Sequence, residues 1–148
     1  RANRMNKQFD FKLDRFYNSN HLWMKKGDNG HVTVGMDELG LDSLGEMAYL
    51  TLPAVGTPVE MGKAMGSMEA AKMTGELFAP ISGIVVEKND AVLQNPLLVN
   101  EDSYDTGWLV KIEPANWTEE SAAMVSGDAL SGWIDAEIER FEIQGIIE

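Results

Sequence analysis

Residues 66–83 read GSMEAAKMTGELFAPISG, and this stretch is the most informative part of the sequence. Within it, Lys72 stands between apolar neighbours and directly follows small residues. A strand on each side would place Lys72 at the tip of a β-hairpin, where its long amine suits an enzyme that attaches a group to it. Small neighbours leave room for that enzyme to approach. Composition alone favours an ordinary exposed lysine, because most lysines lie at the surface.

The segments around this hairpin predict a mainly β domain. Four short runs are rich in β-branched or aromatic residues and are punctuated by glycine, proline or asparagine; they cover 31–35, 48–52, 84–87 and 108–112. Such closely spaced strands are typical of a sandwich or barrel. We also expect a short helix over 37–44 that closes at Gly45, and a C-terminal helix over 132–142, capped by Ser131 and ended by Gly145.

The composition excludes several classes of function. The chain has 148 residues, which suits one domain with a hydrophobic core. Its net charge of −12 argues against nucleic acid or an anionic membrane as partner, because both carry the same sign of charge. Without any cysteine it has no disulfide, no thiolate zinc site and no cysteine nucleophile. The lack of cysteine also fits a reducing cytosol, so we expect a cytoplasmic protein.

No membrane, metal or catalytic signature is present in the sequence. No apolar run approaches the roughly 20 residues that span a bilayer. The two histidines, His21 and His31, lack the spacing of a metal site. No P-loop, dinucleotide-binding motif or nucleophile elbow occurs, so we assign no catalytic residue.

The charge is distributed unevenly along the chain. Residues 1–26 carry seven basic and two acidic groups, residues 27–112 carry four and 13, and residues 113–148 carry one and nine. The chain therefore has a basic head, an acidic middle and an acidic tail. Acidic surfaces of this kind are usually solvated faces, and they can also steer docking onto basic partner proteins.

The hairpin segment resembles the lysine-attachment hairpin of the biotinyl and lipoyl carrier domains. The match is Glu69-x-x-Lys72, followed eight residues after the lysine by the proline of an A-P-x-S-G motif at 79–83. Biotin carriers usually have Met-Lys-Met where this chain has Ala71-Lys72-Met73. Lipoyl carriers of the glycine cleavage H-protein type have a pattern like E-S-V-K-A, which this segment also fits loosely. The hairpin by itself leaves both alternatives open.

The flanking motifs are similar to those of the glycine cleavage H-protein family. They keep their order and spacing from about residue 17 to 114, and they are His21-Leu22-Trp23, Val32-Thr33-Val34-Gly35, Leu52-Pro53-Ala54-Val55-Gly56 and NPLLVNEDSYDTGWL at 95–109. The resemblance implies a lipoyl domain, a barrel-sandwich of two antiparallel sheets with additional helices. It implies lipoic acid in amide linkage on Lys72. The residues flanking the attachment site would be Glu69, Ala71, Met73 and Glu76, and those of the adjoining cleft His21 and Leu22.

The same resemblance implies a carrier that catalyses nothing itself. Its arm would move intermediates between partner enzymes, and the redox sulfurs would belong to the cofactor, which agrees with the missing cysteines. The implied partners are a lipoate-attachment enzyme and the glycine cleavage enzymes: glycine decarboxylase, aminomethyltransferase and dihydrolipoyl dehydrogenase. A biotin carrier is a remote alternative.

Three departures from the family pattern point to a second possible partner system. We give it about the same weight as the glycine cleavage enzymes. Leu22 replaces a glutamate that would stabilise a cationic aminomethyl arm. Residues 36–41 replace a characteristic run of the family, and the tail is longer and carries Trp117 and Trp133. Such departures also fit the lipoate-binding proteins of sulfur-oxidising, heterodisulfide-reductase-like systems, in which the arm carries sulfur intermediates.

We expect three regions along the chain. These are a basic N-terminal extension at 1–16, a lipoyl-carrier domain at 17–114, and an acidic helical extension at 115–148 that packs on the same domain.

Overall fold

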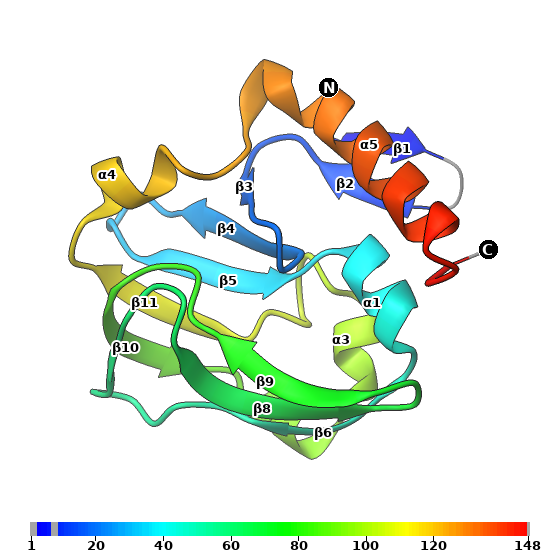
Figure 1. Ribbon diagram of the computed structural model, residues 1–148. Coiled ribbons are helices and arrows are strands. Elements are labelled where there is room, and N and C mark those ends of the chain that lie inside the picture. Colours follow the sequence, from blue (N-terminus) through cyan, green and yellow to red (C-terminus); the bar gives the residue numbers. More distant parts are fainter. Residues whose placement is uncertain (1–2, 7–8, 148) are drawn as a thin grey trace.

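The computed structural model describes residues 3–6 and 9–147 and consists mainly of two antiparallel sheets (Figure 1). The larger sheet has the order β3 (Phe16–Tyr17), β4 (Leu22–Lys26), β5 (Val32–Met36), β11 (Val110–Pro114), β10 (Gly83–Lys88) and β7 (Pro58–Val59). The smaller sheet has the order β6 (Met47–Thr51), β8 (Ala64–Ala70) and β9 (Thr74–Phe78). The barrel-sandwich fold expected from the sequence is confirmed.

The four strand-like runs noted in the sequence correspond to β5, β6, β10 and β11. Their bounds differ by one or two residues, most at β11, which begins at Val110 where the sequence predicted 108. In β5, Val32 and Val34 are fully buried and belong to the main hydrophobic core. That core also takes Met24 from β4, Leu50 from β6 and Leu77 from β9, so residues of both sheets share it. Burial of apolar surface from both sheets stabilises the fold.

A second hydrophobic core joins the two ends of the chain. It contains Phe9 and Phe11 of strand β2 (Phe9–Lys12), which pairs with β1 (Asn3–Asn6) in a separate two-stranded ribbon. Helix α5 (Leu130–Ile143) contributes its buried residues, Leu130, Ile134, Ile138 and Phe141. Figure 1 shows this helix beside the ribbon, above the larger sheet. The expected domain boundaries after residues 16 and 114 stay a prediction. Side chains from both terminal regions are buried together in this second core.

Both expected helices are present. Helix α1 (Glu38–Leu44) begins after Asp37, whose Oδ1 accepts a hydrogen bond from the Gly40 amide at 2.8 Å. It ends at Gly45, whose φ of 82° is a conformation that favours glycine.

The C-terminal helix starts earlier than expected. A 3₁₀ turn at Gly127–Ala129 leads directly into α5, so Ser131 lies inside the helix and the prediction that it caps the helix was wrong. Gly145, with φ 73°, follows the end of α5 as expected. Three short helices had no clear sequence signal: α2 (Asp90–Gln94), α3 (Leu97–Glu101) and α4 (Trp117–Ser121).

Among the described residues, no helix is long and apolar enough to cross a bilayer.

Candidate functional site

Lys72 lies at the tip of the β8–β9 hairpin. Glu69 pairs with Thr74 near the end of the ladder, and the amide of Ala70 donates to the carbonyl of Met73 at 2.9 Å. This pairing leaves only Ala71 and Lys72 in the loop, and both are exposed. The geometry matches the expectation of a lysine presented at a protruding turn.

The hairpin tip is attached to the end of helix α1. The amide of Lys72 donates to the carbonyl of Leu44 at 2.9 Å, and the amide of Ala71 donates to that of Glu46 at 2.9 Å. The ammonium group of Lys72 donates to the carbonyl of Asp42, in the last turn of α1, at 2.8 Å. Cations interact favourably with the carbonyl end of a helix. Two main-chain bonds therefore hold the tip, and a third, exposed bond orients the lysine side chain.

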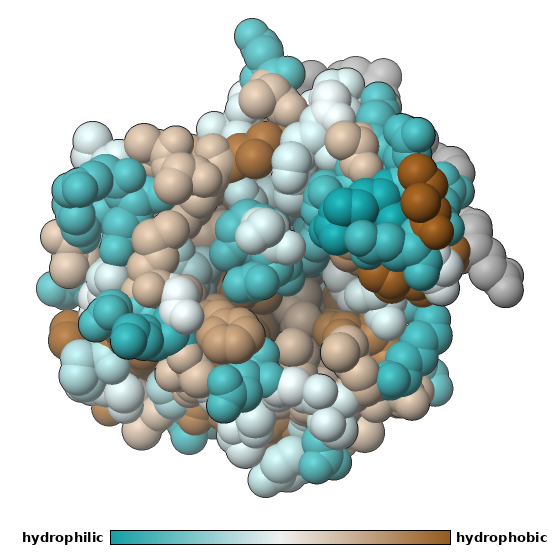
Figure 2. Space-filling view, in the orientation of Figure 1, coloured by the Kyte–Doolittle hydropathy of each residue, from teal (hydrophilic) through white to brown (hydrophobic). Residues whose placement is uncertain are grey.

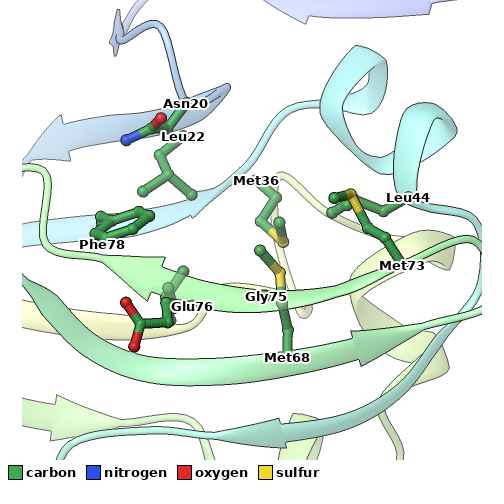
Figure 3. Close-up of a pocket in the computed structure, with 10 residues that line it drawn as sticks. Asn20, Leu22, Met36, Leu44, Met68, Met73, Gly75, Glu76 and Phe78 are labelled. Carbon is green, nitrogen blue, oxygen red and sulfur yellow. The ribbon is translucent and has the colours of Figure 1, made fainter. Parts of the chain in front are cut away.

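An apolar cavity of about 240 Å³ lies beside the hairpin (Figure 3). Its lining is dominated by Leu22, Met36, Leu44, Met68, Met73 and Phe78. Figure 3 shows Met36 of β5 and Met68 of β8 pointing toward one another. In the view of Figure 2, apolar residues gather in the hollow above β9. The cavity thus suits a neutral ligand with hydrocarbon or sulfur atoms.

Glu76 is the one acidic residue in the cavity lining, and its carboxylate points away from the methionines. The register pairs Ser67 with Glu76 and Met68 with Gly75, so Glu76 and Met68 stand on opposite faces of the hairpin. Figure 3 shows the same arrangement, with the carboxylate of Glu76 turned away from Met36 and Met68. Glu69 and Glu76 are both exposed on this hairpin.

A polar recess of about 330 Å³ also borders Lys72. Three acidic residues, Glu38, Asp42 and Glu46, line it together with Asn100. The lysine tip therefore borders an acidic recess, while its neighbour Met73 lines the apolar cavity.

The two residues predicted for the cleft have different places. Leu22 is 2% exposed and lines the apolar cavity. His21 is 3% exposed and is not among the residues that line this cavity. Its Nδ1 lies 2.7 Å from Asp37 Oδ2, its Nε2 lies 2.8 Å from Glu137 Oε1, and its ring stacks on Trp133 at 5.1 Å. His21 thus connects α5 to the start of α1.

The carboxylates around His21 determine its protonation. Burial alone lowers the pKa of His21, but Asp37 and Glu137 outweigh it, so the pKa of His21 lies above its ordinary value. Hydrogen bonds from Arg140, and then from His21, hold the pKa of Glu137 below its usual range despite partial burial. Within the described ranges, no group of three His, Asp or Glu side chains could hold a metal ion.

Sequence reasoning missed the residues that support the lysine. These are the carbonyls of Asp42, Leu44 and Glu46, and the side chain of Asn100. Main-chain carbonyls carry no residue-specific signal. Asn100 lies in the 95–109 block, so its position, though not its role, was visible.

Comparisons with known proteins agree with this geometry. A family model described as glycine cleavage H-protein matches residues 15–135. A protein described as a probable glycine cleavage system H protein, from Thermococcus gammatolerans, is 34% identical over 129 residues, which cover 87% of this chain and 96% of that protein. A glycine cleavage system H protein from Legionella pneumophila is 40% identical over 103 residues, covering 70% and 82% respectively.

A solved structure supports the same grouping. The crystal structure of a glycine cleavage system H protein from Mycobacterium marinum superposes with a TM-score of 0.67 at 33% sequence identity. The match covers 71% of this chain and 87% of that one.

Proposed function

This chain belongs to the glycine cleavage H-protein family, and from that premise we propose that it carries lipoic acid on Lys72 and moves intermediates between partner enzymes. The family supports the general role of a lipoyl carrier, a subunit that is not itself a catalyst. The assignment of the arm to Lys72 and the choice of partners are our proposals.

The observation that carries the proposal is the presentation of Lys72. It is exposed in a two-residue loop that two main-chain bonds hold in place, so an attaching enzyme can reach its amine. Attachment forms one amide bond between Lys72 Nζ and the enzyme-activated carboxyl group of lipoate, and it expels the activating group. The lysine then loses its positive charge. Once attached, lipoate supplies a pair of sulfur atoms that this cysteine-free chain lacks.

The residues around the hairpin fit a lipoyl group. Leu22, Met36 and Met68 offer an apolar, polarisable surface to an apolar ligand. Glu69 and Glu76 keep the exposed faces of the hairpin acidic, which favours docking of basic partner surfaces. We propose glycine decarboxylase, aminomethyltransferase and dihydrolipoyl dehydrogenase as the partners, as in glycine cleavage.

One observation favours a second partner system. Leu22 lies where the family has a glutamate, and the carboxylate of Glu76 faces away from the cavity methionines. A cavity without an internal carboxylate gives no stabilisation to a cationic load. We therefore keep as an alternative that the arm carries neutral or anionic sulfur intermediates for a sulfur-oxidising, heterodisulfide-reductase-like system.

Intact-mass analysis tests the attachment site. The protein is co-expressed with a lipoate ligase, and we expect a mass increase of one lipoyl group that peptide mapping locates on Lys72. Lys72→Arg should abolish the increase, whereas Lys63→Arg, on an exposed lysine outside the hairpin tip, should keep it. An unmodified protein, or a lipoyl group on another lysine, would refute the proposal. A biotinyl group on Lys72 would instead support the remote alternative.

An exchange assay separates the two partner systems. Lipoylated protein is offered glycine, labelled bicarbonate and a glycine decarboxylase. Exchange at the rate of an authentic H-protein supports glycine cleavage as the main role. A rate near background supports the sulfur alternative.

A further inference from the structure

We infer that Asn100, on helix α3, is a positioning residue for Lys72, because it fixes the turn to which the hairpin tip is bonded. This inference rests on the proposed function, since it assigns Asn100 a part in presenting Lys72 to the attaching enzyme. Asn100 is connected to Lys72 through hydrogen bonds of the turn at 44–47.

The hairpin loop does not determine its own shape. Two-residue hairpins favour turns in which one or both loop residues have positive φ, so Gly and Asn are preferred there. The loop here is Ala71-Lys72, and among the described residues His21 is the only non-glycine with positive φ. The loop therefore lacks the local chemistry that normally fixes such a turn, and contacts from elsewhere must hold it.

Those contacts come from the turn that follows α1. The carbonyls of Leu44 and Glu46 accept the amides of Lys72 and Ala71, respectively. Between them lies Gly45, at φ 82°, where an added Cβ would come within 3.2 Å of Ala71 Cβ and 3.3 Å of Lys72 Cγ. The turn and the hairpin tip are thus in close contact, so a movement of one displaces the other.

Asn100 brackets this turn with both ends of its amide. Its Nδ2 donates to the carbonyl of Gly45 at 3.1 Å, and its Oδ1 accepts the amide of Met47 at 2.8 Å. Its neighbour Val99 is fully buried, which anchors α3 in the main core. A rigid part of the core is therefore connected through one side chain to the turn, and through the turn to the attachment residue.

Three variants test this role. Asn100→Ala removes both bonds, and Asn100→Asp keeps the acceptor for Met47 but loses the donor to Gly45. Asn95→Ala is the matched control, because Asn95 is exposed in the same region and no side-chain hydrogen bond is described for it. Amide hydrogen exchange is measured by NMR, and the rate of lipoylation is measured as a function of carrier concentration.

We expect the amides of Ala71 and Lys72 to exchange about tenfold faster in Asn100→Ala, a factor within the range that loss of its two hydrogen bonds produces. Core amides such as those of Val34 and Ile112 should keep their rates, which a general loss of stability would not allow. The kcat/KM of lipoylation should fall about tenfold, chiefly through KM, because a mobile tip is seldom in the competent position. Asn100→Asp should be intermediate, and Asn95→Ala should match the wild type.

Unchanged exchange at Ala71 and Lys72, or equal acceleration of all amides, would overturn the inference. Should Asn100→Ala fail to fold, the same readouts on Asn100→Asp decide the matter. The exchange measurement needs no lipoate. It therefore tests the role of Asn100 even if Lys72 is never modified, an outcome that would refute only the proposed function.

Discussion

Glu137 of helix α5 places its Oε1 2.8 Å from Nε2 of the buried His21. The other ring nitrogen of His21 lies 2.7 Å from Asp37, the residue that caps α1. These contacts form a continuous chain from the C-terminal helix to the helix whose last turn holds the Lys72 ammonium. The docking of α5 is therefore coupled, through one histidine, to the helix beside the candidate site.

This chain predicts a particular dependence of stability on pH. The pKa of His21 is raised above its ordinary 6.5, so its contribution is fully present below that value and is lost as the pH rises through the higher folded-state pKa. The pKa of Glu137 is lowered from 4.5, so its contribution is present above that value and is lost as the pH falls through the lower one. The contributions of His21 and Glu137 to stability are therefore both fully present between pH 4.5 and pH 6.5.

Glu137→Gln should weaken the stabilisation that protonated His21 provides. A neutral amide still accepts a hydrogen bond from His21 but no longer stabilises its charge, so the pKa of His21 should fall and the high-pH loss should begin at lower pH. Urea unfolding between pH 5 and 9, with an NMR titration of His21, measures both. Glu139→Gln changes the same charge at an exposed position of α5 and should leave the profile unchanged. Identical profiles for the two variants would contradict the prediction.

The sequence predicts most reliably those strands whose residue pattern is visible within a few neighbouring positions. The runs at 31–35 and 84–87 alternate or are β-branched and end at glycine or asparagine, so their structure follows from short-range chemistry. The basic head at 1–26 carries seven basic and two acidic groups, and this composition gives no sign of a buried position. Two of its three phenylalanines, Phe9 and Phe11, nevertheless bury against α5, a partner more than 100 residues away that short-range patterns do not reveal.

Phe11→Ala tests how far the N-terminal region contributes to stability. The side chain of Phe11 is fully buried and contacts the rings of Tyr17 and Trp133. Its loss should lower the free energy of unfolding by about 3–5 kcal/mol, the cost typical of a buried aromatic. Leu13→Ala, at a partly buried position in the same region, is the comparison and should cost less. A cost under about 1 kcal/mol for Phe11→Ala would mean that this region is a dispensable extension.

In the candidate site, too, the sequence predicts the residue with local signals but not the distant residues that support it. Lys72 was identifiable because its hairpin has local residue signals. The support of Lys72 was not, since it consists of carbonyls of a distant turn and one asparagine side chain. For His21, the sequence predicts the C-terminal helix but not that Trp133 and Glu137 of this helix cover the histidine.

Gly75 offers a way to fill the apolar cavity without disturbing the fold. It lines the cavity, and an added Cβ there meets no atom within 4 Å. Gly75→Leu should keep or slightly raise stability, since glycine within a strand is unfavourable. Lipoylation of Lys72 should be unchanged, but transfer between partners should slow if the cavity takes part in it. Gly75→Ala fills less of the cavity and should have a smaller effect. Equal transfer rates for both variants would show that the cavity has no role.

Leu22→Glu tests what the cavity accepts. Leu22 is 2% exposed, so a carboxylate there is buried without a described partner, and the free energy of unfolding should fall by about 1–3 kcal/mol. The same carboxylate would attract a cationic load, so glycine–bicarbonate exchange should rise above that of Leu22→Gln, which has the same size and no charge. Urea unfolding and the exchange assay measure the two effects on the same samples. Equal exchange in the two variants, at equal degrees of lipoylation, would mean that the cavity has diverged from the family's pattern by more than one residue.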